Sequence, residues 1–168
     1  MKKYIPLESI QALVFDFDGV LTNNFVVVGQ DGSESVTCSR SDGLAFDVLR
    51  KVNKPAYILS TEKNKVVSAR ANKLKVKVVH GVDNKALAIK QFADEEKFDL
   101  KKILYVGNDV NDYNAMKLCG YTACPSDSHE IIKLNSTIVL NSKGGCGVAR
   151  EIVEEVFRID FNKILYAE

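Results

Sequence analysis

The chain has 168 residues, 46% of them hydrophobic, and a formal net charge of +1. This length and apolar content suit a single folded domain over residues 1–168 and exclude a disordered chain. The near-zero net charge disfavours a nucleic-acid-binding protein with a broad basic face.

The cysteines and the hydrophobic runs exclude further classes. The four cysteines show no Cys-x-x-Cys spacing, which disfavours a structural zinc site, and their scatter suits a reducing compartment. No apolar segment follows Lys2 and Lys3, so we expect no signal peptide. No run approaches the ~20 apolar residues that span a bilayer. We therefore expect a cytoplasmic protein with no membrane contact.

The first half of the chain opens with a short apolar run at 12–16, which is typical of a buried strand in a parallel sheet. Two β-prone runs, 25–28 and 34–38, flank an Asp-Gly turn and predict a hairpin over about residues 24–39. Apolar residues at helical spacing then predict a helix over 41–52.

After the hairpin segment, predicted strands and helices alternate along the sequence to the end of the chain. This order indicates an α/β fold with a mostly parallel sheet, in which the hairpin is the one irregular insertion. The predicted strands are 56–59, 76–79, 103–106, 121–123 and 138–140, and the predicted helices are 63–74, 85–96, 111–119, 128–134 and 147–157.

Polar side chains follow the predicted strands at their carboxyl ends, where open α/β sheets bind ligands. Asp16 and Asp18 close the first strand and Ser60 closes the second. Lys85 follows the third strand, and the run Gly107–Asp112 follows the fourth. Carboxylates can hold Mg²⁺, and a lysine with a hydroxyl can bind phosphoryl oxygens. An aspartate can serve as a phosphorylated nucleophile, while its neighbour exchanges protons.

Each of these features has an ordinary structural reading when it stands alone. A single Asp-x-Asp pair is common, a lysine at a helix start is usually a solvated charge, and an acidic run is often a turn with a helix cap. Their joint occurrence, in order and at strand ends, favours a phosphoryl-transfer site.

These residues resemble the motifs of the haloacid dehalogenase superfamily of phosphatases. The run Asp16–Thr22 resembles the first motif, Ser60 the second, Lys85 the third and Gly107–Asp112 the fourth. The resemblance implies a Rossmann-like three-layer core. It also implies that Asp16 is the nucleophile, that Asp18 is the general acid and base, and that Ser60 and Lys85 hold the phosphoryl group.

The resemblance also implies a Mg²⁺ site and a phosphate-facing glycine. The metal would be bound by Asp16, by the backbone carbonyl of Asp18 and by the fourth motif. Gly19 would let backbone amides approach the phosphate. The candidate ligands in the fourth motif are Asn108, Asp109 and Asp112.

The spacing of the motifs leaves no room for a cap domain. Only 41 residues separate Asp18 from Ser60, and only 24 separate Ser60 from Lys85. The chain resembles, over nearly its whole length, the capless phosphatases of 3-deoxy-octulosonate 8-phosphate and of nine-carbon 2-keto-3-deoxy sugar acid 9-phosphates. The resemblance implies a homotetramer in which the hairpin helps to cover a neighbouring active site.

Three positions depart from the capless group. Thr61 stands where many relatives have glycine, and Asn108 stands where the octulosonate enzymes usually have an aspartate ligand. Asn23 and Asn24 replace the usual Asp-Gly pair. An amide oxygen can ligate Mg²⁺ but contributes no charge, so Asn108 weakens the expected metal site.

The substrate candidates follow the second motif and the last glycine-rich turn. Thr61 would lie beside the phosphate. Arg70 and Lys73 are candidates for binding a sugar-acid carboxylate, with a solvated basic face as the alternative. Arg150 would either reach an active site, its own or a neighbour's, or remain a surface charge. Glu62 resembles the nonulosonate enzymes and favours a nine-carbon acid.

Several functions remain open at this point. The nine-carbon substrate would place the chain in nonulosonate (sialic acid) biosynthesis, and the alternative octulosonate 8-phosphate would place it in lipopolysaccharide biosynthesis. A receiver-type signalling domain is disfavoured because the acidic pair follows the first strand. A weakly active or inactive module associated with an acylneuraminate cytidylyltransferase is favoured by Asn108 and disfavoured by the complete set of the other motif residues.

Overall fold

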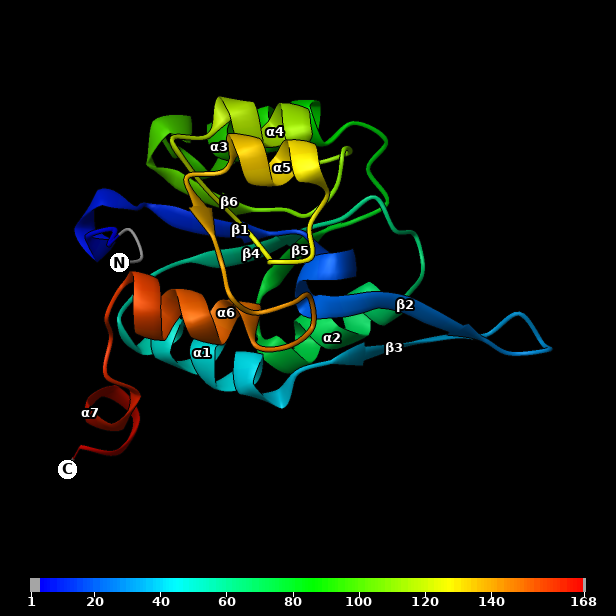
Figure 1. The fold of residues 1–168 in the computed structure, drawn as a ribbon, viewed down its shortest axis with the longest axis horizontal. Coiled ribbons are helices and arrows are strands. Elements are labelled where there is room, and N and C mark those ends of the chain that lie inside the picture. The colour runs from blue at the N-terminus through cyan, green and yellow to red at the C-terminus, as the bar shows by residue number, and fades with distance from the viewer. Residues whose placement is uncertain (1–3, 168) are drawn as a thin grey trace.

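The computed structural model describes residues 4–167, and a six-stranded parallel sheet runs through its centre (Figure 1). The strand order is β5-β4-β1-β6-β7-β8, which places β1 between the strands that carry the second and fourth motifs. The strands are β1 (Ala12–Phe15), β4 (Ala56–Leu59), β5 (Lys77–Val79), β6 (Ile103–Val106), β7 (Tyr121–Cys124) and β8 (Ile138–Val139).

Helices cover both faces of this sheet, so the predicted three-layer α/β fold is confirmed (Figure 1). One face carries α1 (Arg40–Lys51), α2 (Val66–Leu74) and α6 (Val148–Glu151), which a π-helical turn, η4 (Ile152–Val156), continues. The other face carries α3 (Lys85–Glu96), α4 (Tyr113–Leu118) and α5 (Glu130–Asn135). Short 3-10 turns are η1 (Leu7–Ser9) and η3 (Leu100–Lys102).

The alternation of side chains along β1 divides the core into two layers. Leu13 and Phe15 point to the face covered by α1, where Phe15 meets the ring of Phe46 edge-on at a centroid distance of 5.3 Å. Ala12 and Val14 point to the opposite face, toward α3 and α4. All four strand residues are buried, as the continuous apolar run predicts for a parallel strand with helices on both sides.

The predicted hairpin is present as β2 (Thr22–Val28) and β3 (Glu34–Cys38), and it extends away from the body of the molecule (Figure 1). Its turn contains Gly32 at φ +80°, a conformation that favours glycine. The hairpin and α1 fill the segment between Asp18 and β4, and α2 and β5 fill the segment before α3. Neither segment of the described chain contains a cap domain.

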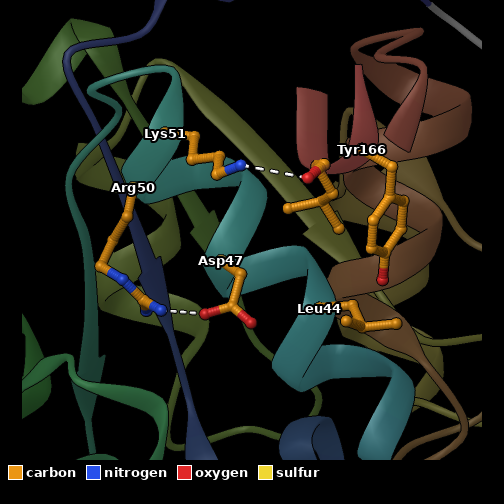
Figure 2. Close-up of a pocket in the computed structure, with 6 residues that line it drawn as sticks. Leu44, Asp47, Arg50, Lys51 and Tyr166 are labelled. Carbon is orange, nitrogen blue, oxygen red and sulfur yellow. Dashed lines mark hydrogen bonds and ion pairs between the residues drawn. The ribbon is translucent and has the colours of Figure 1, made fainter. Parts of the chain in front are cut away.

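Several helical regions differ from the sequence prediction, among them the unpredicted π-helical turn η2 (Phe17–Leu21). α2 begins at Val66, three residues later than predicted, because Glu62 and Asn64 accept backbone hydrogen bonds from the residues that follow them and form a turn. The short α7 (Phe161–Tyr166) was not predicted. Lys51 on α1 donates to two backbone oxygens of α7, and a cavity lined by both helices lies beside this contact (Figure 2).

Within residues 4–167, no helix combines the length and apolarity needed to cross a membrane. The assignment of the complete chain to one domain stays a prediction.

The buried carboxyl of Asp42 couples stability to pH. Its Oδ1 accepts a hydrogen bond from the Arg150 backbone amide (3.1 Å), yet burial raises its pKa from 3.8 to about 6. The folded chain therefore holds this proton more tightly than the unfolded chain does. The resulting stability, up to about 3 kcal/mol, is present below pH 4 and is lost as the pH rises through about 6.

The Asp42→Asn variant should lack this part of the pH dependence. Urea unfolding between pH 4 and 7 measures it, and the difference between the two proteins isolates the contribution of Asp42 from that of other groups. Equal slopes of unfolding free energy against pH in both proteins would contradict the assignment.

Candidate active site

The motif residues meet because three neighbouring strands end at the same edge of the sheet. Asp16 follows β1, Ser60 follows β4 and Asn108 lies two residues beyond β6, and these three strands are adjacent. A cavity of about 190 Å³ opens at this edge. It is lined by Asp16, Asp18, Asn24, Thr61, Asn108, Asp109, Val110 and Asn111.

Asp16 lies almost fully buried at the floor of this cavity. Its Oδ1 accepts a hydrogen bond from the Phe17 amide (2.7 Å) and pairs with the Lys85 ammonium (2.7 Å). Burial and the neighbouring charge of Asp112 raise the pKa of Asp16 well above its ordinary value, against the opposing effect of Lys85. A divalent cation beside this group would favour the carboxylate form.

Lys85 is held between two carboxylates beneath the cavity. It is the first residue of α3, whose start Asn84 caps by accepting from the Leu87 amide (3.0 Å). Its ammonium lies 2.7 Å from both Asp16 Oδ1 and Asp112 Oδ1. Burial lowers the pKa of Lys85, but the two carboxylates outweigh burial and the net shift is upward. The lysine is therefore a fixed cation.

Protein donors occupy both oxygens of the fully buried Asp112. Oδ1 accepts from Lys85 and from the Tyr105 hydroxyl (2.7 and 2.9 Å), and Oδ2 accepts from the amides of Asn108 and Asp109 (2.9 and 3.4 Å). Asp112 thus joins α3, β6 and the fourth motif. Its predicted role as a direct metal ligand stays a prediction, and Tyr105 is a site residue that sequence reasoning missed.

A set of possible metal donors surrounds the amide of Asn108. One terminal atom of this amide lies 3.2 Å from Asp16 Oδ2 and 2.9 Å from the Asp18 carbonyl oxygen. With nitrogen at that position the amide donates to both oxygens, and with oxygen there three oxygen atoms converge. Such a set suits a hard cation, so these residues fit Mg²⁺. Among residues 4–167, no three His, Cys, Asp or Glu side chains cluster as a metal site. Two of the donors described here are instead a side-chain amide and a backbone carbonyl.

Gly19 is required by the geometry around Asn108. Its φ is +78°, and a Cβ atom at this position would lie 2.0 Å from the Asn108 amide. Its own amide donates to the Thr22 hydroxyl (3.2 Å). The structure therefore gives Gly19 a packing role beside Asn108, and its predicted contact with phosphate stays a prediction.

Asp18 differs from Asp16 in its environment. It is half-buried, and burial followed by the charge of Glu62 raises its pKa, with a smaller contribution from Glu34. Lys85 and the Thr22 hydroxyl oppose this shift. A carboxyl that retains its proton nearer to neutral pH suits a general acid.

The remaining predicted residues divide into two groups. Ser60 is buried beside the cavity, where its hydroxyl accepts from the Glu62 amide (3.1 Å), and Thr61 lines the cavity itself. Arg70 donates to the Ser39 carbonyl (2.7 Å), and Lys73 is exposed on α2. Neither basic side chain lines the catalytic cavity.

Arg150 also lies outside the catalytic cavity. Its guanidinium pairs with Glu154 (2.5 Å) and stacks over the Phe161 ring at 4.0 Å. A role for Arg70, Lys73 or Arg150 in binding substrate stays a prediction, and it would have to act across a subunit boundary or after a rearrangement.

The fold and this site define a known class of enzyme. Residues 44–152 match the family model of the haloacid dehalogenase-like hydrolases, and the chain belongs to this family. The predicted family, its capless fold and its phosphatase class are thereby confirmed.

Two individual relatives are similar to this chain over most of its length. The chain is 27% identical over 148 residues to 3-deoxy-D-manno-octulosonate 8-phosphate phosphatase from Salmonella typhi, covering 88% of this chain and 79% of the relative. A HAD family hydrolase from Streptomyces avermitilis is 42% identical, with a TM-score of 0.87 over 90% of this chain and 87% of that one.

A further solved structure shares the fold at lower identity. The octulosonate 8-phosphate phosphatase from Moraxella catarrhalis, solved with magnesium, phosphate and KDO, is 23% identical with a TM-score of 0.86. The match covers 93% of this chain and 90% of that one.

Proposed function

We propose that this chain is a Mg²⁺-dependent phosphatase that hydrolyses the terminal phosphate ester of a 2-keto-3-deoxy sugar acid through an aspartyl-phosphate on Asp16. The observation that carries the proposal is the contrast between two aspartates two residues apart. Asp16 is buried with its Oδ1 2.7 Å from the Lys85 ammonium, while Asp18 is half-buried and lines both the catalytic cavity and the cavity beside it. One suits a nucleophile and the other suits a general acid.

The reaction proceeds in two displacements. A carboxylate oxygen of Asp16 attacks phosphorus while the bond from phosphorus to the ester oxygen breaks, and Asp18 gives its proton to that departing oxygen. Asp18, now a carboxylate, then accepts a proton from water as the water oxygen attacks the aspartyl-phosphate. The bond between phosphorus and Asp16 breaks, and inorganic phosphate leaves with the enzyme restored.

Charge compensation lets two anions approach each other. Lys85 lies 2.7 Å from Asp16, where it can pair with the phosphoryl oxygens, and Ser60 adds a hydroxyl. Mg²⁺, held by Asp16, the Asp18 carbonyl and Asn108, would supply the remaining positive charge. Asp109 lines the same cavity and is a further candidate ligand.

The nine-carbon acid is the favoured substrate because a glutamate at position 62 resembles the nonulosonate enzymes. Glu62 lines a cavity together with Asp18, where it adds an acceptor for sugar hydroxyls. Octulosonate 8-phosphate is the second candidate, favoured by the names of the curated relatives. Phosphate release from both substrates, with Mg²⁺ and with excess chelator, tests the proposal. Faster release from the eight-carbon substrate would reverse the preference, and no metal-dependent release from either would refute the function.

The apolar hairpin supports a tetramer. Phe25, Val27 and Val28 are exposed on β2, with Phe25 at 76%. Exposed apolar residues grouped on one element favour burial against another subunit. Such packing would also help to cover the open catalytic cavity.

Phe25→Asp should therefore shift the chain from tetramer toward smaller species, because it places a charge in the proposed interface. Light scattering measures the mass. Leu134→Asp on α5 is the matched control, since Leu134 is also 76% exposed but lies off the hairpin. Equal masses for wild type and both variants would count against hairpin-mediated assembly.

A further inference from the structure

A second cavity adjoins the catalytic one on the side of the hairpin. It has a volume of about 290 Å³, and Asp18 and Asn24 line both cavities. A leaving group released next to Asp18 would therefore extend into it. Its remaining lining residues are Phe25, Val26, Glu34, Val36, Glu62 and Val66.

The hairpin register brings Glu34 to this cavity. Val28 pairs with Glu34 and Val26 pairs with Val36, and residues two apart on a strand share a face. Glu34 and Val36 therefore lie on the same face of the hairpin, above Val66 of α2. Glu34 and the catalytic Asp18 line the same cavity, and of these two only Asp18 also lines the catalytic cavity.

Asn64 fixes the two glutamates relative to each other. Its side-chain amide donates to Glu34 Oε2 (3.0 Å), and its backbone amide donates to Glu62 Oε1 (2.7 Å). The Lys63 amide also donates to Glu62 Oε1 (2.7 Å). The second oxygen of each glutamate, Oε1 of Glu34 and Oε2 of Glu62, accepts no hydrogen bond from the residues that the structure describes.

The backbone behind Glu62 is also held in place. Its carbonyl accepts from the Gly81 amide (2.9 Å) and lies 3.3 Å from His80 Nδ1, while His80 Nε2 lies 2.8 Å from the Ser68 hydroxyl. Glu62 is thus carried by a loop with defined partners on α2 and beyond β5.

The negative charge of the side chains that line this cavity favours a ligand with hydroxyl groups over an anionic one. Three carboxyl groups line it, and none of the described residues that line it is Lys, Arg or His. An anionic group would be repelled there, whereas hydroxyl groups can donate to the unoccupied carboxylate oxygens. The apolar residues opposite can pack against carbon–hydrogen faces.

We propose that Glu34, positioned by Asn64, determines leaving-group specificity: together with Glu62 it accepts hydrogen bonds from the hydroxyls next to the phosphate ester and excludes a carboxylate from that segment. This inference rests on the proposed function and deepens it. A sugar acid phosphorylated on its terminal carbon fits, because its carboxylate and its phosphate lie at opposite ends. The carboxylate must then bind outside this cavity.

Three small phosphate esters test the proposal: glycerol 3-phosphate, 3-phosphoglycerate and p-nitrophenyl phosphate. The first two differ in whether a hydroxymethyl or a carboxylate lies near the ester, and the third carries neither. Wild type should have a kcat/KM at least about tenfold higher for glycerol 3-phosphate than for 3-phosphoglycerate. Glu34→Gln, which removes the charge, should reduce this ratio at least about threefold.

Glu34→Leu, which removes the acceptor, should lower kcat/KM for glycerol 3-phosphate by about tenfold and leave p-nitrophenyl phosphate within about twofold. Glu95→Gln on the exposed surface of α3 is the control and should change neither value.

An unchanged ratio in Glu34→Gln, or an equal loss on all three esters in Glu34→Leu, would overturn the inference while leaving the phosphatase intact. Release from the sugar-acid phosphates with none from glycerol 3-phosphate would overturn the inference alone, whereas no metal-dependent release from either sugar-acid phosphate would refute the proposed function and the inference with it.

Discussion

Replacing Asp16 with asparagine should reduce phosphate release at least about a thousandfold, because the amide cannot form the acyl-phosphate. The fold should survive the change. An asparagine oxygen can still accept from the Phe17 amide, and Lys85 keeps its contact with Asp112. Steady-state phosphate release with Mg²⁺ measures the loss, and circular dichroism checks the fold.

Asp83→Asn is the matched control for this experiment. Asp83 lies two positions before Lys85, and its side chain is 95% exposed. The loss of the Asp83 charge in this variant should change kcat/KM by less than about twofold. Wild-type turnover in Asp16→Asn would rule out Asp16 as the nucleophile.

Replacing Asp112 with asparagine should destabilise the chain by about 3 kcal/mol or more, because it breaks a buried ion pair and its hydrogen bonds. Donors face both oxygens of Asp112: Lys85 and Tyr105 on one, and backbone amides on the other. An asparagine amide has one acceptor and one donor, so its NH₂ group would face another donor in either orientation. Urea unfolding measures the change.

Asp109→Asn provides the comparison within the same loop. Asp109 is only half-buried, and its Oδ1 accepts from the Val110 amide (2.7 Å). That variant should lose less than about 1 kcal/mol. If Asp112→Asn unfolds at the same urea concentration as wild type, the buried network does not stabilise the fold.

The central sheet could be predicted from the sequence because its strands are continuous apolar runs that end in polar residues. The run at 12–16 and the acidic pair after it carry both signals. The order of the motifs then placed Asp16, Ser60 and Asn108 at one edge, where the structure has them. The hairpin followed from a glycine turn between β-prone runs.

Other parts of the site depend on contacts between distant segments, which periodicity does not encode. Tyr105 looks like one more apolar strand residue, and only the fold brings its hydroxyl to Asp112. Glu34 and Asn64 are 30 positions apart and meet through the hairpin register. Arg70 has the charge to bind a carboxylate, but the fold directs it to the Ser39 carbonyl.

The side-chain amide of Asn108 can link Asp16 and the Asp18 carbonyl both without a bound cation and with one. With its nitrogen inward it can bridge Asp16 and the Asp18 carbonyl by hydrogen bonds, and with its oxygen inward it can join them around a cation. An aspartate at position 108 would offer only the second arrangement, and without a cation its charge would repel Asp16. With asparagine at this position the loop could stay ordered before a cation binds, and a cation that bound there would replace the two hydrogen bonds.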